Sequence, residues 1–150
     1  MFKETIQLET LRQKIEDAEI ESGSQSDYLD RGQPNAGQVK QAQDTINKLR
    51  NQINVSRMEL SKLIAIVRLQ SPQAINEWVN FHADILQKIV NEAPTGKNAK
   101  VRENLAKGAL QEWEKVRNGE QDYVRINWYF LNDYRESAKR INAKSSQFWK

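Results

Sequence analysis

The residues from 36 to 70 carry the feature that most constrains the fold, an uninterrupted heptad pattern. Nine positions in this segment follow one another in alternating steps of three and four: Val39, Ala42, Ile46, Leu49, Ile53, Ser56, Leu60, Leu63 and Val67. This spacing is typical of a helix that packs in a coiled coil. We call these nine positions the seam. A helix of this length spans ~50 Å, so the seam also predicts a facing helix along most of it.

The second half of the same segment contains further apolar residues outside the seam. They are Val55, Met58, Ile64, Ile66 and Leu69. An apolar set this broad indicates burial on more than one side. We therefore expect other helices to surround this half.

The composition favours helices elsewhere too, because 150 residues contain only three prolines and six glycines, with 38% hydrophobic and 29% charged residues. The sequence predicts an all-α fold, an elongated antiparallel helical bundle in a single domain. Four helices are expected, at about 2–21, 36–70, 72–92 and 98–144, with a loop at 22–35.

Three positions bear on the boundaries of these helices. Gly23, Gly32 and Pro34 lie among polar residues and predict the loop at 22–35. Ser71-Pro72 is a helix start directly after residue 70, so we expect helix 72–92 to turn back on helix 36–70. A break at 118–119, at Asn118-Gly119, would give a fifth helix. The seven-residue step from Val116 to Tyr123 favours a continuous or kinked helix instead.

Aromatic residues are concentrated in the last predicted helix, where five of the twelve fall between Tyr123 and Tyr134. Helical spacing places one set on a single face, namely Val116, Tyr123, Asn127, Phe130, Tyr134 and Ile141, widened by Trp113, Val124, Leu131 and Ala138. We expect this face to hold the bundle together.

Charge is unevenly distributed along the chain. Residues 1–30 carry three basic and eight acidic side chains, whereas residues 31–150 carry twenty basic and twelve acidic ones. We expect the acidic first helix to lie against a basic element of the same chain. The alternative is a basic body that is free to meet an acidic partner.

Recognisable catalytic spacing is missing from the sequence. There is no cysteine, and His82 is the single histidine, which argues against metal sites built from several such ligands. We expect His82 to be a core histidine hydrogen-bonded to a neighbouring group, the alternative being a base that works with Asp84 or Glu77. Thr95-Gly96-Lys97 lacks the earlier glycine and the following Ser or Thr of a phosphate-binding loop. The sequence predicts no enzyme activity, cofactor, metal or small-molecule substrate.

A basic and aromatic stripe follows the back of the predicted last helix. It consists of Arg117, Gln121, Arg125, Trp128, Asn132, Arg135 and Lys139, with Tyr129 on another side. Arginine and tryptophan anchor protein interfaces, and cations with an interleaved aromatic also suit nucleic acid. The third interpretation is a solvated face, or one covered by the acidic first helix.

These patterns predict a non-enzymatic assembly or adaptor subunit that binds a protein partner or itself through the seam and the aromatic back of the last helix. The candidate partner-binding residues are Arg117, Arg125, Trp128, Tyr129, Arg135 and Lys139. The alternative is a nucleic-acid-binding accessory protein that uses Arg117, Arg125, Trp128, Tyr129, Arg135 and Lys139. Phe148 and Trp149 would form a docking peptide or cap the bundle. The absence of a long apolar run and of a leader predicts a soluble, cytoplasmic protein with no membrane contact.

Overall fold

The computed structural model describes residues 1–92, 96, 98–126, 130 and 134. Over these residues it is all-α, with no strand, which confirms the predicted fold class. The helices are α1 (Lys3–Arg31), α2 (Ala36–Gln70), α3 (Pro72–Asn91) and α4 (Ala99–Arg117).

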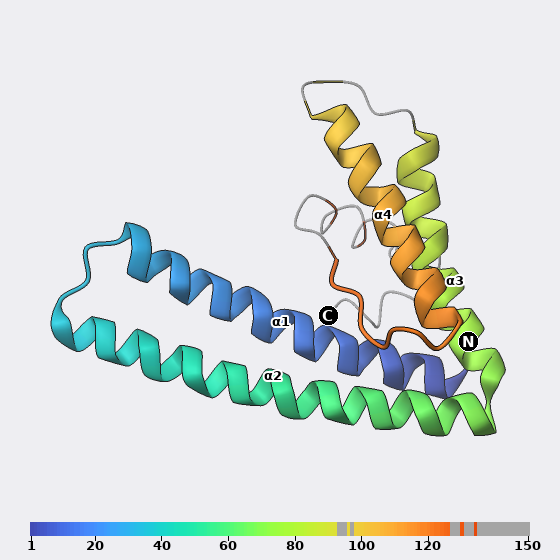
Figure 1. Ribbon diagram of the computed structural model, residues 1–150, viewed down its shortest axis with the longest axis horizontal. Helices are drawn as coiled ribbons and strands as arrows, with labels where there is room; N and C mark the ends of the chain where they lie inside the picture. The colour runs from blue at the N-terminus through green and yellow to red at the C-terminus, as the bar shows by residue number, and fades with distance from the viewer. Residues whose placement is uncertain (93–95, 97, 127–129, 131–133, 135–150) are drawn as a thin grey trace.

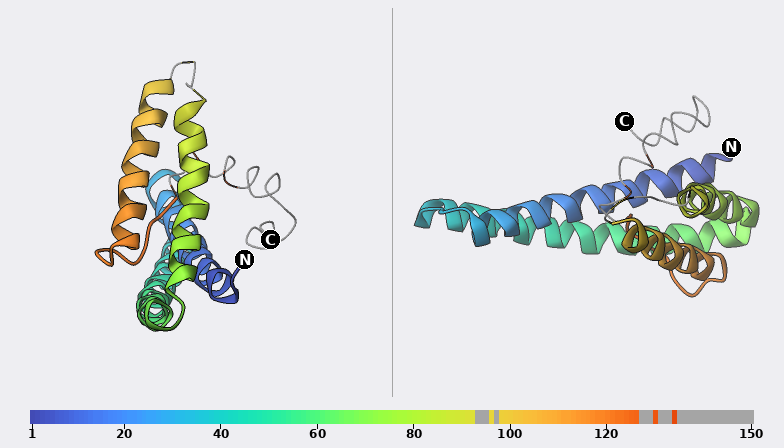
Figure 2. Two further views of the ribbon diagram at one scale, coloured as in Figure 1. Left: turned by 90° about the vertical axis from the view of Figure 1, so that its right-hand side faces the viewer. Right: turned by 90° about the horizontal axis from the view of Figure 1, so that it is seen from above.

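The four helices form two antiparallel hairpins that cross (Figure 1). Helices α1 and α2 make a long hairpin, and α3 and α4 make a shorter one that stands across one end of it (Figure 2). The expectation that helix 72–92 turns back on helix 36–70 was wrong. Ser71, with φ −146° and ψ 63°, redirects the chain, so that α3 leaves α2 steeply and also packs on α1.

Helix α2 has the bounds that the sequence predicts. Asn35 caps its first turn by accepting a hydrogen bond from the backbone of Gln38, whose side chain in turn accepts one from the Asn35 backbone. All seam positions are buried or half-buried, and α1 is the helix that faces them. The heptad pattern therefore describes an intramolecular pair.

Helix α1 is longer than expected, because the predicted loop at 22–35 is helical up to Arg31. Only residues 32–35 join α1 to α2. The helix continues through Gly23 although glycine weakens a helix by roughly 0.5–1 kcal/mol. Residues 22–31 lie opposite the first half of the α2 seam, and this packing outweighs the weak local preference (Figure 1).

The last helix ends at Arg117, so the predicted continuous helix over 98–144 was wrong and the break at 118–119 is where the helix stops. Gly119 has φ +82°, and the amides of Gly119 and Glu120 donate to the carbonyls of Val116 and Lys115. This pattern is a Schellman motif. The rest of the predicted helix, at 127–129, 131–133 and 135–144, lies outside the described residues, as do Phe148 and Trp149.

Arg68 of α2 forms hydrogen bonds with the C-terminal end of α4. Its guanidinium donates to the backbone carbonyls of Val116 at 2.9 Å and Arg117 at 3.1 Å. The last carbonyls of a helix have no helical amide after them to bond, and a cation also interacts favourably with the negative end of the helix dipole. The chain beyond Gly119 then runs in a non-helical conformation over residues 120–126.

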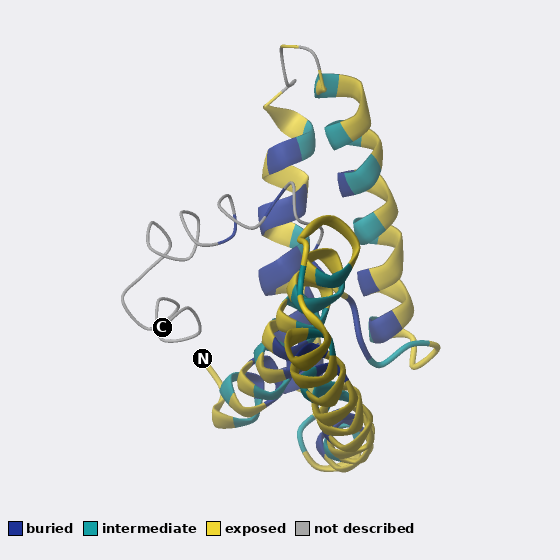
Figure 3. Ribbon diagram, turned by 90° about the vertical axis from the view of Figure 1, so that its left-hand side faces the viewer, coloured by how far each residue is buried: buried dark blue, intermediate teal, exposed yellow. Residues whose placement is uncertain are grey.

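The core lies where the two hairpins cross (Figure 3). Trp78 of α3 and Trp113 of α4 meet edge to face, with ring centroids 5.1 Å apart, and His82 stacks on Trp113 at 4.1 Å. The predicted burial of Val116, Tyr123, Phe130 and Tyr134, with that of Trp113 and Val124, is confirmed. A single helix does not position this set, because the chain leaves the helix at Arg117. Asn127, Leu131, Ala138 and Ile141 of the predicted face lie outside the described residues.

Candidate functional site

Arg117 of the predicted basic stripe joins α4 to α3. Its guanidinium donates to the side-chain amide oxygens of Asn76 at 3.1 Å and Asn80 at 2.6 Å. It also pairs with Glu114 one turn earlier in α4, at 3.0 Å. Arg117 is therefore engaged in contacts between the two helices of the short hairpin.

Arg125 and Gln121 lie beyond the end of α4, so they do not share a helical face with Arg117. Arg125 pairs with Glu19 of α1 at 3.6 Å, and Gln121 donates to the Tyr123 carbonyl and the Glu112 carboxylate. Of the predicted stripe, Trp128, Asn132, Arg135 and Lys139 lie outside the described residues, as does Tyr129. The helical arrangement proposed for 117–125 is wrong because Gly119 ends the helix. The pair Glu19–Arg125 agrees with the expectation that acidic residues of α1 face basic residues elsewhere.

Four ionisable side chains are buried in the core: Glu9, Arg12 and Glu16 of α1, and His82 of α3. We call them the buried network. Each side chain is at most 4% exposed. Glu9 accepts hydrogen bonds from Arg12 Nε at 2.7 Å and from Trp78 Nε1 at 3.2 Å, and lies 2.6 Å from His82 Nε2. One carboxylate thus connects α1 to α3.

The second half of the buried network holds the segment that follows α4. Arg12 Nη1 donates to Glu16 at 2.8 Å and to the Val124 carbonyl at 3.4 Å. The backbone amide of Ile126 donates to the same Glu16 oxygen at 2.9 Å. Because residues 124–126 have no helical hydrogen bonds, these side chains satisfy backbone groups that would otherwise be buried without partners.

The protonation states follow from burial and from the neighbouring charges. Burial alone would raise the pKa of Glu9, but the charge of Arg12, the interaction with His82 and the hydrogen bonds lower it to about 2. Burial opposes the charge on Arg12, yet Glu9 and Glu16 raise its pKa above the usual range. Burial lowers the pKa of His82, against the attraction of Glu9. At neutral pH both Glu9 and Arg12 are charged and His82 is neutral, so its Nε2–H donates to Glu9.

The arrangement confirms that His82 is a core histidine hydrogen-bonded to a neighbour. The alternative partners are placed elsewhere, because Glu77 accepts a hydrogen bond from the Phe2 backbone and Asp84 is exposed. Arg12 Nη2 and His82 Nδ1 are buried without a hydrogen-bond partner among the described residues, but the other contacts of the network link α1 to α3 and to residues 124–126. A solvent-borne substrate has no access to side chains this deeply buried.

Sequence reasoning missed Glu9, Arg12 and Glu16, although a signal was present. Read as a helix, these residues are spaced by three and four, on the same side as Leu8 and Ile15. Charged residues on the apolar side of a helix point to buried pairs.

The most exposed apolar surface is on α2, on the side away from α1. Val55, Met58, Ile66 and Leu69 are between 48% and 87% exposed. Their spacing in α2 places them within a stripe of roughly 80°, opposite the seam. We call these four side chains the outer stripe. The expectation that other helices cover them was wrong for the described part of the chain, whereas Ile64 is buried as expected.

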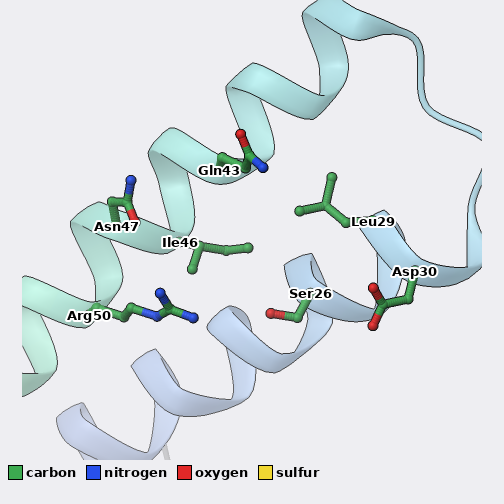
Figure 4. A pocket seen from close by; sticks show the side chains of 7 residues that line it. All are labelled: Ser26, Leu29, Asp30, Gln43, Ile46, Asn47 and Arg50. Carbon is green, nitrogen blue, oxygen red and sulfur yellow. The ribbon is translucent and has the colours of Figure 1, made fainter.

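Shallow grooves flank α2, and two of them have volumes near 500 Å³. One, of about 520 Å³, lies between the second half of α2 and the turn after α4, with Leu69 and Arg68 on one side and Glu120 and Asp122 on the other. The other, of about 490 Å³, lies at the far end of the long hairpin. Figure 4 shows Leu29 and Ile46 between the two helices, and polar side chains around them. Carboxylates line both grooves, Glu120 and Asp122 in the first and Asp30 in the second.

Within the described ranges, no group of three histidine, cysteine or acidic side chains could hold a metal ion. None of the helices there is both long and apolar enough to cross a membrane. Comparison of the chain with protein-family models, curated proteins and solved structures finds no match.

Proposed function

We propose that this protein is a non-enzymatic interaction or assembly subunit that binds a protein partner through the outer face of α2. The observation that carries the proposal is the outer stripe, with Leu69 87% and Met58 61% exposed. Leu, Ile, Val and Met are among the residue types most often found inside proteins. Four of them along one side of one helix form an apolar surface, interrupted at Lys62, that suits a helical partner.

The other helical faces are less available to a partner. The seam of α2 packs against α1, and the apolar sides of α3 and α4 meet in the core. Arg117 and Arg125 are paired with groups of the same chain. The outer face of α2 thus combines apolar character with access.

The size of the stripe sets the expected strength of binding. Full burial of one such side chain contributes about 1.5–3 kcal/mol to the binding free energy. Because the side chains of the outer stripe are already partly covered by α2 itself, each should contribute about 1 kcal/mol. Association itself costs at least ~4 kcal/mol. This surface therefore supports reversible binding, strengthened by polar contacts at its rim.

Site-specific photo-cross-linking tests the proposal. A photo-reactive amino acid replaces Met58 in the outer stripe and, in the control, replaces Lys48 two turns before Val55 on the same side of α2. In cells that express the chain, we expect a discrete cross-linked protein from position 58 and much less from position 48. Equal, diffuse labelling from both positions would contradict the proposed surface.

Nucleic-acid binding through Arg117, Arg125, Trp128, Tyr129, Arg135 and Lys139 stays a prediction. It requires affinity for single strands or duplex that falls steeply with salt. The variant Arg125→Glu with Arg135→Glu should then lose this affinity. Because Arg117 contacts Asn76 and Asn80, its replacement would also disturb the fold and is unsuitable as a test.

A further inference from the structure

We infer that the partner of the outer stripe is a second copy of this chain, packed antiparallel along α2. This inference rests on the proposed function, because it identifies the molecule that covers the same surface. Two charged residues accompany the stripe: Lys62 lies within it and Glu59 lies at its edge. Glu59 and Lys62 lie between Met58 and Ile66 on the outer face of α2.

Both charges are exposed and have no ion pair among the described residues. A lysine in the middle of an apolar stripe is costly to cover unless the partner supplies a carboxylate. The partner that fits the stripe must therefore place an acid opposite Lys62 and a base opposite Glu59.

A second copy meets this requirement by symmetry. When two α2 helices pack antiparallel about a two-fold axis near residues 60 and 61, Glu59 of each copy faces Lys62 of the other. The same register places Val55 opposite Ile66, so apolar residues flank the two ion pairs. A two-fold interface uses one surface twice and must be self-complementary in this way. A polar residue within an apolar stripe is also a known device for fixing helix register.

The geometry of the fold leaves room for this pair. Figure 1 shows α2 along the lower edge of the molecule, with α1 and the α3–α4 hairpin above it. Leu69, at one end of the stripe, lines the groove beside the turn after α4. The contact covers about four turns of each helix, which places it among the small interfaces below about 1,200 Å². Eight outer-stripe side chains and two ion pairs, less the cost of association, give a reversible dimer with a dissociation constant on the order of 10⁻⁴ M.

Charge reversal provides the test, with sedimentation of the full chain from 2 to 500 µM as the readout. Glu59→Lys alone and Lys62→Glu alone each place like charges opposite one another twice, and each should weaken the dimer about tenfold or more. The combined variant Glu59→Lys with Lys62→Glu should recover it. An equimolar mixture of the two single variants should also form dimers. Helix content by circular dichroism checks that every variant is folded.

Two results would overturn the inference. The first is a wild-type chain that stays monomeric at 500 µM. The second is a dimer that neither single reversal weakens. If the chain is monomeric while position 58 cross-links to a different protein, the second copy is rejected and the proposed function stands. Cross-linking to no protein at all rejects both.

Discussion

Replacing Glu9 by glutamine tests whether the buried network holds the two hairpins together. The substitution keeps the shape of the side chain and removes its charge. Glu9 accepts hydrogen bonds from Arg12, Trp78 and His82, which come from α1 and α3. A glutamine has one acceptor oxygen and turns an NH₂ group toward at least one of these donors.

Two independent arguments give the expected size of the effect. Removing one partner of a buried ion pair costs about 3–5 kcal/mol, because the other charge stays buried. The pKa of Glu9 is lowered from 4.5 to about 2 by folding, which corresponds to about 3 kcal/mol at neutral pH. We therefore expect Glu9→Gln to lower the free energy of unfolding by about 3–5 kcal/mol at pH 7.

The pH dependence of the free energy of unfolding gives a second test of Glu9. A carboxylate whose pKa is lower in the folded state stabilises the protein above its unfolded pKa of 4.5, and this contribution is lost as the pH falls toward about 2. Wild type should lose about 3 kcal/mol from this group across that window, whereas Glu9→Gln should not. Urea unfolding followed by circular dichroism at pH 7, 5, 4 and 3 measures both chains. Glu21→Gln, an exposed position on the same helix, is the matched control and should change stability by less than about 0.5 kcal/mol.

The account of the network would be refuted by a loss below 1 kcal/mol at pH 7. A difference between wild type and Glu9→Gln that stays constant down to pH 3 would also refute it. If Glu9→Gln does not fold, Glu16→Gln replaces it, since Glu16 holds only Arg12 and the Ile126 amide.

Three further changes have outcomes set by single features. Burial lowers the pKa of His82 in the folded state, so the free energy of unfolding should decline as the pH falls below about 6.5. Thermal unfolding between pH 7.5 and 5.5 should show this decline in wild type but not in His82→Gln. Gly119→Ala should lower the free energy of unfolding by about 1–2 kcal/mol because φ is +82°, whereas Gly108→Ala, in an open position within α4, should raise it by about 0.5–1 kcal/mol in the same urea experiment. Arg117→Ala should cost about 1 kcal/mol by the same measurement through the lost contacts with Asn76 and Asn80, and a gain in stability would contradict the role assigned to it.

Helix periodicity was sufficient to predict α2 and α3 from the sequence, because long apolar repeats and the Asn35 and Ser71-Pro72 starts agree there. The predicted end of the first helix at residue 21 was wrong, because that prediction considered only the weak helix propensity of Gly23 and its serine neighbours. The seam offered a correction, since a helix of 35 residues needs a partner longer than the predicted 2–21. Tertiary pairing decided that boundary.

The end of α4 shows a different limit. The seven-residue step from Val116 to Tyr123 kept the apolar phase across Gly119, although the chain leaves the helix there. Both residues are buried because residues 120–126 pass back over the core, held by Glu16 and Arg12. No periodicity records such a contact between residues more than one hundred positions apart. The crossing of the two hairpins was unpredictable for the same reason.

The surface proposed for binding could be found only with the structure in hand. The sequence marked Val55, Met58, Ile66 and Leu69 as apolar, and the reasonable expectation was burial within the chain. Their exposure becomes evident only once the positions of α1 and α3 are known. The buried network, by contrast, was readable in principle from the spacing of Glu9, Arg12 and Glu16.

A distance between two copies of α2 tests the central claim most directly. The chain has no cysteine, so Gln52→Cys introduces a single site for a spin label on the exposed side of α2. The proposed register brings Gln52 opposite Leu69 of the other copy, 17 positions away, which is roughly 25 Å along the helix. With a helix separation of about 8–10 Å, pulsed dipolar spectroscopy should give a distance of roughly 25–30 Å, and Lys62→Glu should reduce the amplitude of this signal at equal concentration. A distance near 10 Å would indicate parallel helices, and the absence of any dipolar signal at 500 µM would contradict pairing through this face.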